Sequence, residues 1–272
     1  MKKWLLKSGL SLLAVGLIFS VIGRVMGGET TTQVKAFGQN LTLSCAPLSL
    51  SGLYGYSAGE SKNVHSMSDL ELDAFQTLEI DVDLGDISIL TGDYGVELEW
   101  WGENYQLSYT NEGGTLKVRS SSPQPNFGFC GGKVTVYVPE GTVLDRLDVN
   151  ADLGGVDLSG IRARQADLTL SLGSLTGYDL TVTDKLTVEA DLGDVDLSGD
   201  LRGLVDVQAS LGSVELDLSG PVSEYSYDVK VSLGEIWVDG NEHVGEHISG
   251  GRGSTVIQIN ADLGDVELYF DV

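Results

Sequence analysis

Apolar and polar residues alternate in short runs along most of the chain beyond residue 78. A clear run ends at a glycine and has its apolar side chains at Leu186, Val188, Ala190 and Leu192. This is the period of a β-strand with one buried face. Beyond Gly193 the apolar residues continue at Val195 and Leu197. Val195 is three positions after Leu192, so one unbroken strand would place the two side chains on opposite faces. The pattern therefore predicts that Gly193 turns the chain, so that apolar residues on both sides of it reach one core.

The same unit recurs along the chain, each copy centred on a glycine. Successive glycines are 69, 19, 20, 19, 22 and 30 residues apart. A step near twenty that holds three times in succession predicts a structural repeat. The predicted corner residues are Gly85, Gly154, Gly173, Gly193, Gly212, Gly234 and Gly264.

Two architectures fit a strand, a corner and a second strand. One is a β-solenoid whose coils stack, and the other is an antiparallel meander with hairpin turns. The residue two positions before each repeat glycine favours stacking, because aspartate is interspersed with serine and an unbroken aspartate ladder would be repulsive. These positions are Asp152, Ser171, Asp191, Ser210, Ser232 and Asp262. We therefore predict an all-β fold, with a single β-solenoid domain over residues 69–272.

Residues 93–138 break the twenty-residue rhythm with longer alternating runs. Terminal coils of a repeat array need a cap, and this segment is the predicted one, with a hairpin turn at residues 111–114. Its aromatic residues are expected to pack in the cap; they are Trp100, Trp101, Tyr105 and Tyr109. At the other end, the last coil is expected to close the domain.

The N-terminus carries Lys2, Lys3 and Lys7 before sixteen uncharged residues that end at Arg24. We interpret residues 1–28 as a transmembrane anchor that meets the lipid bilayer through residues 5–26, with a cleaved signal peptide as the alternative. The lysines predict a cytoplasmic N-terminus and an extracytoplasmic C-terminal domain, as in a single-pass protein of the bacterial cell membrane. Residues 29–68 are rich in turn-forming residues and are expected to be a spacer.

Charge limits the choice of partners. The full chain has a net charge of −24, and all 40 acidic residues but only 12 of the 16 basic ones lie beyond Gly28. Nucleic acid and anionic lipid are poor partners for such a surface. Two interpretations remain: the acids keep the domain soluble, or they collect cations, cationic peptides or envelope components.

Three features suggest site chemistry. The cysteines, Cys45 and Cys130, could form a disulfide or stay reduced in an exported domain. Residues 243–247 spell H-x-x-E-H, a zinc-protease motif, but the surrounding glycines oppose the helix that this chemistry needs. Carboxylates face each other across three repeat glycines, and we interpret them as solvated turns and not as calcium sites; the pairs are Asp83/Asp86, Asp191/Asp194 and Asp262/Asp265. No metal, cofactor or catalytic residue is expected.

The order of these motifs resembles a known family. Residues 75–82 lead into Gly85, residues 134–142 follow, and the Leu-Gly-Asp-Val repeats come after them. In this the chain resembles the bacterial putative-adhesin family, a domain of unknown function that is anchored in the membrane. The resemblance implies a β-solenoid at the cell envelope, with relatives associated with envelope stress and antimicrobial-peptide responses.

Two functional classes remain open. The favoured one is a non-enzymatic module with an acidic binding surface, acting as an adhesin or in envelope interaction and stress sensing. The alternative is a polysaccharide-acting β-helix enzyme, which would need Arg162 and Arg164 beside Asp167 and Asp184 in a cleft.

Overall fold

The computed structural model describes residues 31–36, 39–44, 64–102, 104–121 and 130–271. The chain divides into two units, Met1–Tyr56 and Ser57–Val272. In the first unit, the described residues form an antiparallel hairpin of β1 (Thr31–Ala36) and β2 (Gln39–Ser44). This hairpin lies within the predicted spacer, residues 29–68.

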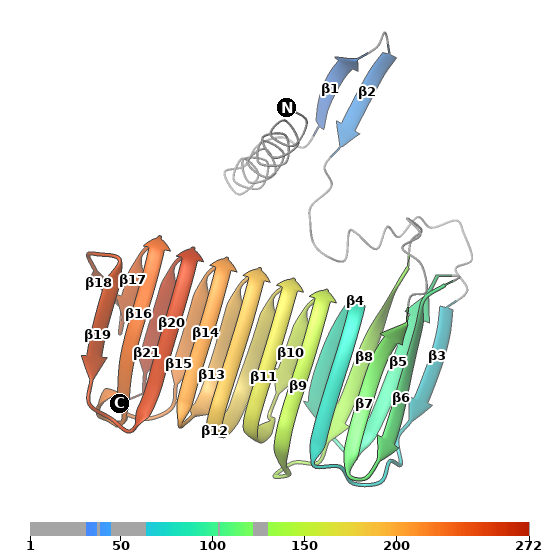
Figure 1. Ribbon diagram of the computed structural model, residues 1–272. Helices are drawn as coiled ribbons and strands as arrows, with labels where there is room; N and C mark the ends of the chain where they lie inside the picture. Colours follow the sequence, from blue (N-terminus) through green and yellow to red (C-terminus); the bar gives the residue numbers. More distant parts are fainter. Residues whose placement is uncertain (1–30, 37–38, 45–63, 103, 122–129, 272) are drawn as a thin grey trace, which may run out of the picture. The chain divides into compact units, whose positions relative to one another are not determined.

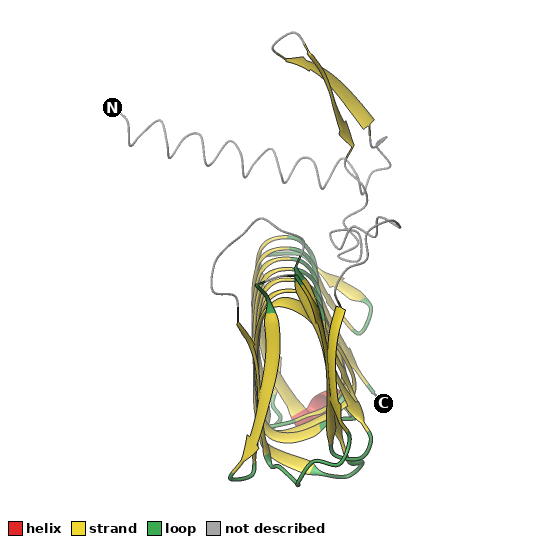
Figure 2. Ribbon diagram, turned by 90° about the vertical axis from the view of Figure 1, so that its right-hand side faces the viewer, coloured by secondary structure: helices red, strands yellow, loops and turns green. Residues whose placement is uncertain are grey.

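The second unit is a stack of coils, and each coil has one strand in each of two facing walls (Figures 1 and 2). The first wall holds the strands before the repeat glycines. In spatial order they are the first half of β4 (Thr77–Thr91), β9 (Val143–Leu153), β11 (Arg162–Leu172), the second half of β12 (Leu175–Leu192), β14 (Leu204–Leu211), β20 (Thr255–Leu263) and β16 (Tyr225–Leu233).

The second wall holds the strands after the glycines. In spatial order they are the second half of β4, β10 (Val156–Ser159), the first half of β12, β13 (Val195–Leu201), β15 (Val214–Leu218), β21 (Val266–Phe270) and β17 (Ile236–Val238). Neighbouring strands in both walls are parallel. The predicted stack of coils is therefore confirmed, and the meander is wrong for these units.

The core fills the space between the walls. Leu186 and Val188 are fully buried, and Val195 of the other wall is 1% exposed. Buried side chains of one coil stand in register with apolar side chains of the next, as Val188 does with Val207. Burial of one such side chain is worth about 1.5–3 kcal/mol. The two-residue period of the sequence thus becomes continuous aliphatic ladders along the stack.

The coils do not stack in chain order at the C-terminal end. The last coil, β20 and β21, lies between the coil of β14 and β15 and the coil of β16 and β17. The amide of Gly212 accordingly donates to the carbonyl of Leu263, and that of Gly264 donates to the carbonyl of Leu233. The expectation that the last coil closes the domain is wrong.

The long step between Gly234 and Gly264 explains this order. Within it, β18 (Asn241–His243) pairs antiparallel with β17, and β19 (His247–Gly251) pairs antiparallel with β16. These short strands lie at the outer edge of the stack (Figure 1). The chain then returns to fill the slot that was left between the two preceding coils.

Spatial order also makes the aspartate and serine positions regular. Two positions before each corner glycine, the stack reads Asp83, Asp152, Ser171, Asp191, Ser210, Asp262 and Ser232. From Asp152 onward the alternation is unbroken, whereas in chain order two serines are adjacent. Like charges are thus kept two rungs apart along most of this row.

The cap predicted for residues 93–138 covers the opposite end of the stack. It consists of β5 (Gly95–Trp101), β6 (Gln106–Glu112), β7 (Thr115–Ser121) and β8 (Gly131–Val138), with β7 and β8 parallel to β4. The predicted hairpin turn is present between β6 and β7, where Gly113 and Gly114 have φ of 61° and 77°.

The sheet also extends beyond the predicted boundary at residue 69. Strand β3 (Val64–Asp69) pairs antiparallel with β5 at the edge of the cap. Its first five side chains are exposed, so it has no buried face that would produce a sequence period. This is why the boundary was placed too late.

The corner glycines allow adjacent coils to approach closely. Gly193 has φ of +146°, and a Cβ atom there would overlap the carbonyl oxygen of Gly173 in the next coil. The same overlap with the neighbouring corner would occur at Gly154, Gly173, Gly212, Gly234 and Gly264, and Gly85 would meet Gly132. Only a residue without a side chain fits this geometry.

Replacement of Gly193 by alanine is therefore expected to destabilise the stack by more than about 3 kcal/mol. Gly141→Ala is the matched control, because Gly141 has φ of +79° but nothing within 4 Å of an added Cβ. The control should lose only about 1–2 kcal/mol, from backbone strain. Urea unfolding of both variants measures the difference, and equal losses would show that close approach of the coils is not the constraint.

Candidate interaction surface

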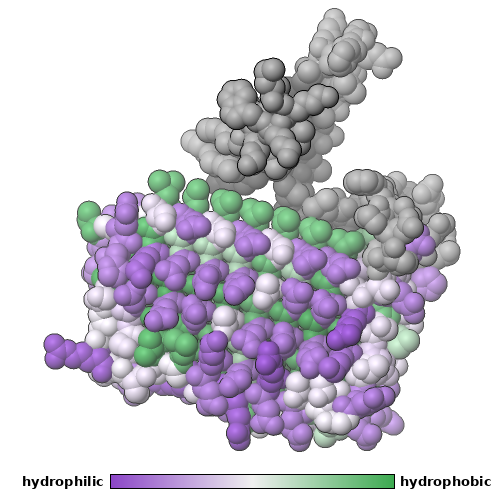
Figure 3. Space-filling view, in the orientation of Figure 1, coloured by the Kyte–Doolittle hydropathy of each residue, from purple (hydrophilic) through white to green (hydrophobic). Residues whose placement is uncertain are grey.

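A row of leucines follows the glycine corners along one edge of the stack. We call it the leucine ridge; in spatial order it comprises Leu84, Leu153, Leu172, Leu192, Leu211, Leu263 and Leu233. Leu172, Leu192 and Leu263 are 45%, 43% and 39% exposed, and Leu233 at the end is 66% exposed. Figure 3 shows a line of hydrophobic side chains along this edge.

The ridge corrects the sequence analysis, which assigned these leucines to the core. The chain begins to turn at the leucine itself, one residue before the glycine. Ala190 and Val195 therefore point inward, at 3% and 1% exposed, while Leu192 lies on the outside of the corner. A period of two cannot distinguish a buried leucine from one at the turn.

Carboxylates lie on both sides of the ridge. On the side after the glycine, they bind the backbone of the next coil. Asp86 accepts a hydrogen bond from the amide of Gly155 (3.1 Å), and Asp194 accepts one from the amide of Ser213 (2.9 Å). Asp265 does the same for the amide of Glu235 (2.8 Å). These aspartates stabilise the corners, and their remaining charge borders the leucines.

Within the described ranges, no group of three or more His, Cys, Asp or Glu residues has the arrangement of a metal site. In the three carboxylate pairs considered for calcium, the second aspartate uses one carboxylate oxygen to accept a hydrogen bond from a backbone amide; these residues are Asp86, Asp194 and Asp265. This is the hydrogen bonding of a turn-stabilising residue.

The second wall carries a cluster of carboxylates on its outer face. Asp196, Glu215 and Glu267 stand directly opposite one another on three adjacent rungs, and Asp217 is two residues from Glu215. Burial raises the pKa of Glu215, and the neighbouring charges of Asp196, Glu267 and Asp217 raise it further. Among the described residues, these four carboxylates have no ion-pair partner. We call them the acidic cluster.

The first wall is different, because several of its carboxylates lie in ion pairs. Arg146 binds Asp148 at 3.0 Å and Asp167 at 3.1 Å, and Arg164 binds Asp145 at 3.5 Å. Asp184 instead accepts a hydrogen bond from Thr183. Three of the four residues proposed for an enzyme thus have partners outside that set: Asp167 pairs with Arg146, Arg164 pairs with Asp145, and Asp184 bonds to Thr183.

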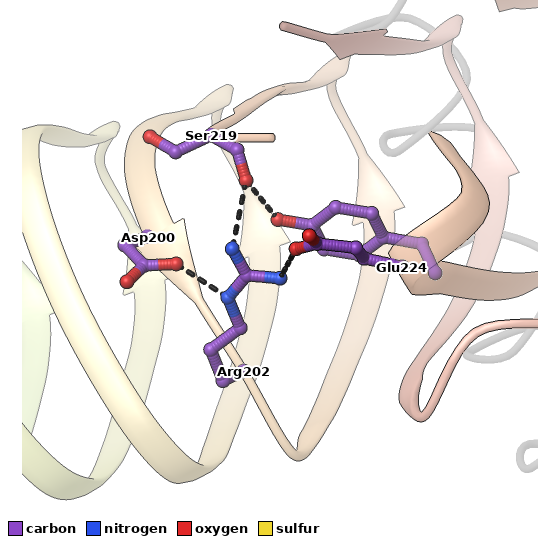
Figure 4. A network of polar contacts seen from close by, with 5 residues as sticks. Asp200, Arg202, Ser219 and Glu224 are labelled. Atoms are coloured by element: carbon purple, nitrogen blue, oxygen red, sulfur yellow. Dashed lines mark hydrogen bonds and ion pairs between the residues drawn. The ribbon is translucent and has the colours of Figure 1, made fainter. Parts of the chain in front are cut away.

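Arg202 forms a second polar network, at the corner opposite the ridge (Figure 4). Its guanidinium donates to Asp200, to Glu224 and to the carbonyl of Ser219, and it lies 5.1 Å from the centre of the Tyr225 ring. Residues 219–224 connect β15 to β16 and pass the position in the stack that β20 and β21 occupy between them. The network fixes this crossover and is structural.

The H-x-x-E-H motif is split between two strands. His243 ends β18 and His247 begins β19, so they do not share a helical face. The His247 ring nitrogen lies 3.2 Å from Asp228, and this hydrogen bond, with a further one from Lys230, lowers the pKa of the Asp228 carboxyl. Here the motif contributes an edge contact between β19 and β16.

The cap aromatics are used mainly in packing. Trp100 and Tyr105 are buried, and the Tyr105 hydroxyl donates to the carbonyl of Leu84. The hydroxyl of Tyr109 donates to Asp69, which raises the pKa of the phenol. His65 stacks on Trp100 beside a pocket. The lining of this pocket includes Gly102, Asn104 and Ser121, which are next to residues that the structure does not describe, 103 and 122–129.

Two predicted features fall on residues that are not described. Cys130 is half-buried against the core, but Cys45 lies outside the described residues, so their disulfide stays a prediction. The predicted anchor, residues 5–26, lies there too. In the part of the chain that is described, no helix is long and apolar enough to cross a membrane.

The stacked coils and glycine corners define a β-solenoid repeat protein. Residues 75–201 match the family model Toastrack DUF4097. Over that stretch, the resemblance to a putative-adhesin family of unknown function that was found in the sequence is confirmed. The coils beyond residue 201 continue the same stack outside the matched range.

Solved structures with similar folds share little sequence with this chain. A putative cell adhesion protein from Clostridium sporogenes is 12% identical with a TM-score of 0.40, covering 78% of this chain and 100% of its own. A putative adhesin from Bacteroides fragilis is 12% identical with a TM-score of 0.34, covering 76% and 98%. A putative lipid binding protein from Parabacteroides distasonis is 12% identical with a TM-score of 0.28, covering 77% and 97%. Likeness at this level carries no argument about function. No curated protein matches the sequence.

Replacement of Glu215 by glutamine is expected to stabilise the protein at neutral pH. Because the pKa of Glu215 is raised above its ordinary value of 4.5, the folded state holds this proton more tightly than the unfolded chain. Stability therefore falls as the pH rises from about 4.5 through the folded pKa. Because the Glu215 side chain is exposed, water screens part of this repulsion, so Glu215→Gln should gain only about 0.2–1 kcal/mol at neutral pH and nothing below the unfolded pKa.

Glu189→Gln is the matched control, because its register neighbours are Thr169 and Gln208. Urea unfolding of both variants at neutral and acidic pH measures the effect. A gain at Glu189 equal to that at Glu215 would show that the acidic cluster carries no repulsion of its own.

Proposed function

We propose that this protein is a non-enzymatic module of the bacterial cell envelope that binds cationic molecules through its acidic surface. The observation that carries the proposal is the acidic cluster, in which Asp196, Glu215 and Glu267 occupy adjacent rungs without an ion-pair partner among the described residues. Like charges in register oppose folding, so the chain retains them at a cost in stability. A cationic ligand would remove that cost on binding.

The overall charge supports the same ligand class. Beyond Gly28 the chain has 40 acidic and 12 basic residues. Such a field attracts cationic peptides and repels nucleic acid and anionic lipid. The proposed role is that of an adhesin or an envelope-interaction and stress-sensing protein.

The proposed location is the outer side of the cell membrane. The support is the apolar segment of residues 5–26, with Lys2, Lys3 and Lys7 before it and an acidic domain after it. This charge pattern favours a cytoplasmic N-terminus and an extracytoplasmic C-terminal domain.

The polysaccharide-acting enzyme is the weaker candidate. It would need arginines and carboxylates converging in a cleft, whereas Arg164 and Arg146 pair with Asp145 and Asp167 on the outer face of the first wall. The side chains of Arg146 and Arg164 are 48% and 63% exposed.

Binding of poly-lysine tests the proposed ligand class. The full chain is expected to bind poly-lysine at low ionic strength and to release it at about 0.5 M NaCl, where the Debye length is only a few ångströms. The triple variant Asp196→Asn/Glu215→Gln/Glu267→Gln should bind at least about tenfold more weakly.

A control triple variant, Asp157→Asn/Glu189→Gln/Asp206→Asn, removes the same charge from exposed or half-buried sites outside the cluster. It should bind poly-lysine nearly as well as the natural chain. Equal losses of affinity in both triple variants would show that binding depends on net charge and not on the acidic cluster. No binding of poly-lysine by the natural chain would refute the proposal.

A fusion experiment tests the location. With alkaline phosphatase at its C-terminus, the chain is expected to give enzyme activity that stays with the membrane fraction after a carbonate wash, because the phosphatase folds only outside the cytoplasm. Replacing Lys2, Lys3 and Lys7 by glutamate should lower that activity by weakening the orientation signal. Activity found only in the soluble fraction would indicate a cleaved signal peptide, and no activity would place the domain inside.

A further inference from the structure

The leucine ridge is an exposed apolar surface that the fold does not need for its core. Seven leucines in register form one continuous line, and four of them are at least 39% exposed. At about 4.7–4.9 Å per rung, the line is roughly 29 Å long. Soluble proteins seldom expose contiguous apolar surface of this kind without a partner for it.

We propose that the leucine ridge is the docking surface for a cationic amphipathic helix. This inference rests on the proposed function and specifies the site and the shape of the ligand. The helix would present a stripe of apolar side chains to the leucines, with lysine or arginine side chains on both sides of that stripe.

The charges beside the ridge select this partner. At one rung, Asp191 precedes Leu192 and Asp194 follows the glycine after it, so carboxylates border the leucine on both sides. Lys230 is the only basic residue within three positions of any ridge leucine, and it is paired with Asp228 at 3.1 Å. A second copy of this chain or an anionic bilayer would bring like charges together along the whole line.

The backbone at the ridge selects a helix over an extended strand. The carbonyls of Leu172, Leu192 and Leu211 accept hydrogen bonds from the amides of Gly154, Gly173 and Gly193 in neighbouring coils. The corner backbone is therefore already paired from coil to coil, and a strand laid along it would leave its own amides without partners. A helix satisfies its backbone internally and can bind through side chains alone.

The length of a helix can also match the length of the leucine ridge. A helix rises 1.5 Å per residue, so about 19 residues cover the ridge. Its apolar stripe recurs every three to four residues, at intervals close to the spacing of the leucines.

Two peptides of about 19 residues test the inference. Both contain the same leucines and lysines, but only one has its leucines on a single helical face. The full chain, held in phosphatidylcholine nanodiscs, is expected to bind the striped peptide about tenfold more tightly than the permuted one, after subtraction of binding to empty nanodiscs.

The ridge variant is Leu172→Gln/Leu192→Gln/Leu233→Gln/Leu263→Gln. Glutamine is chosen because its side chains can form ladders along stacked strands, so the coils should keep their thermal stability. This variant should bind both peptides equally. The control variant, Val143→Gln/Tyr178→Gln, removes exposed apolar side chains (46% and 70% exposed) away from the ridge and should keep the preference.

The outcomes separate the inference from the proposed function. If both peptides bind the natural chain equally and salt releases them, the ridge is not the docking surface and the proposed function stands. If neither peptide binds, both fail. If the ridge variant changes only binding to phosphatidylglycerol vesicles, or only self-association in sedimentation, the occupant is a membrane or a second copy and the inference is overturned.

Discussion

The fold depends on close backbone contact between coils at the glycine corners. The corner glycines have φ near +150°, and five of the seven donate their amide to the coil beside them, as Gly193 does to the carbonyl of Leu211. A side chain on Gly193 would overlap the carbonyl oxygen of Gly173. This contact sets the spacing of the rungs, and the aliphatic ladders of both walls follow from that spacing. A single coil has too little core to stand alone, so its stability comes from its neighbours.

Much of this architecture could be predicted from the sequence. The alternation around Gly193 predicts the strands, the recurrence of the unit predicts coils, and Gly113 and Gly114 predict the cap hairpin. These signals are local, because they depend on the period of one strand or the φ of one residue. The insertion of β20 between β14 and β16 is not local, since any coil of the repeat offers nearly the same edge. Spacing alone could not reveal it, although the break in the aspartate and serine alternation at Ser232 was a signal.

The candidate site was predicted only in part. The acidic character of the domain follows from composition, but the acidic cluster requires Glu215 and Glu267 to be adjacent, and these residues are 52 positions apart in sequence. The leucine ridge was missed because Leu192 fits the buried period of its strand. Only the direction of the chain at the corner shows that this residue faces solvent. Strand β3 was not predicted because none of its faces is buried, so its sequence has no apolar period.

A pair of engineered cysteines tests the stacking order most directly. With Cys45 and Cys130 replaced by serine, the variant Ser210→Cys/Asp262→Cys places two cysteines on adjacent rungs, flanked by the registered pairs Ala209–Ala261 and Leu211–Leu263. Their Cα atoms should be about 5 Å apart, within the range of a disulfide. The variant Ser210→Cys/Ser232→Cys joins units that are consecutive in sequence but two rungs apart, beyond that range. We expect oxidation to form a disulfide in the first variant and leave two thiols in the second, and the reverse result would contradict the account.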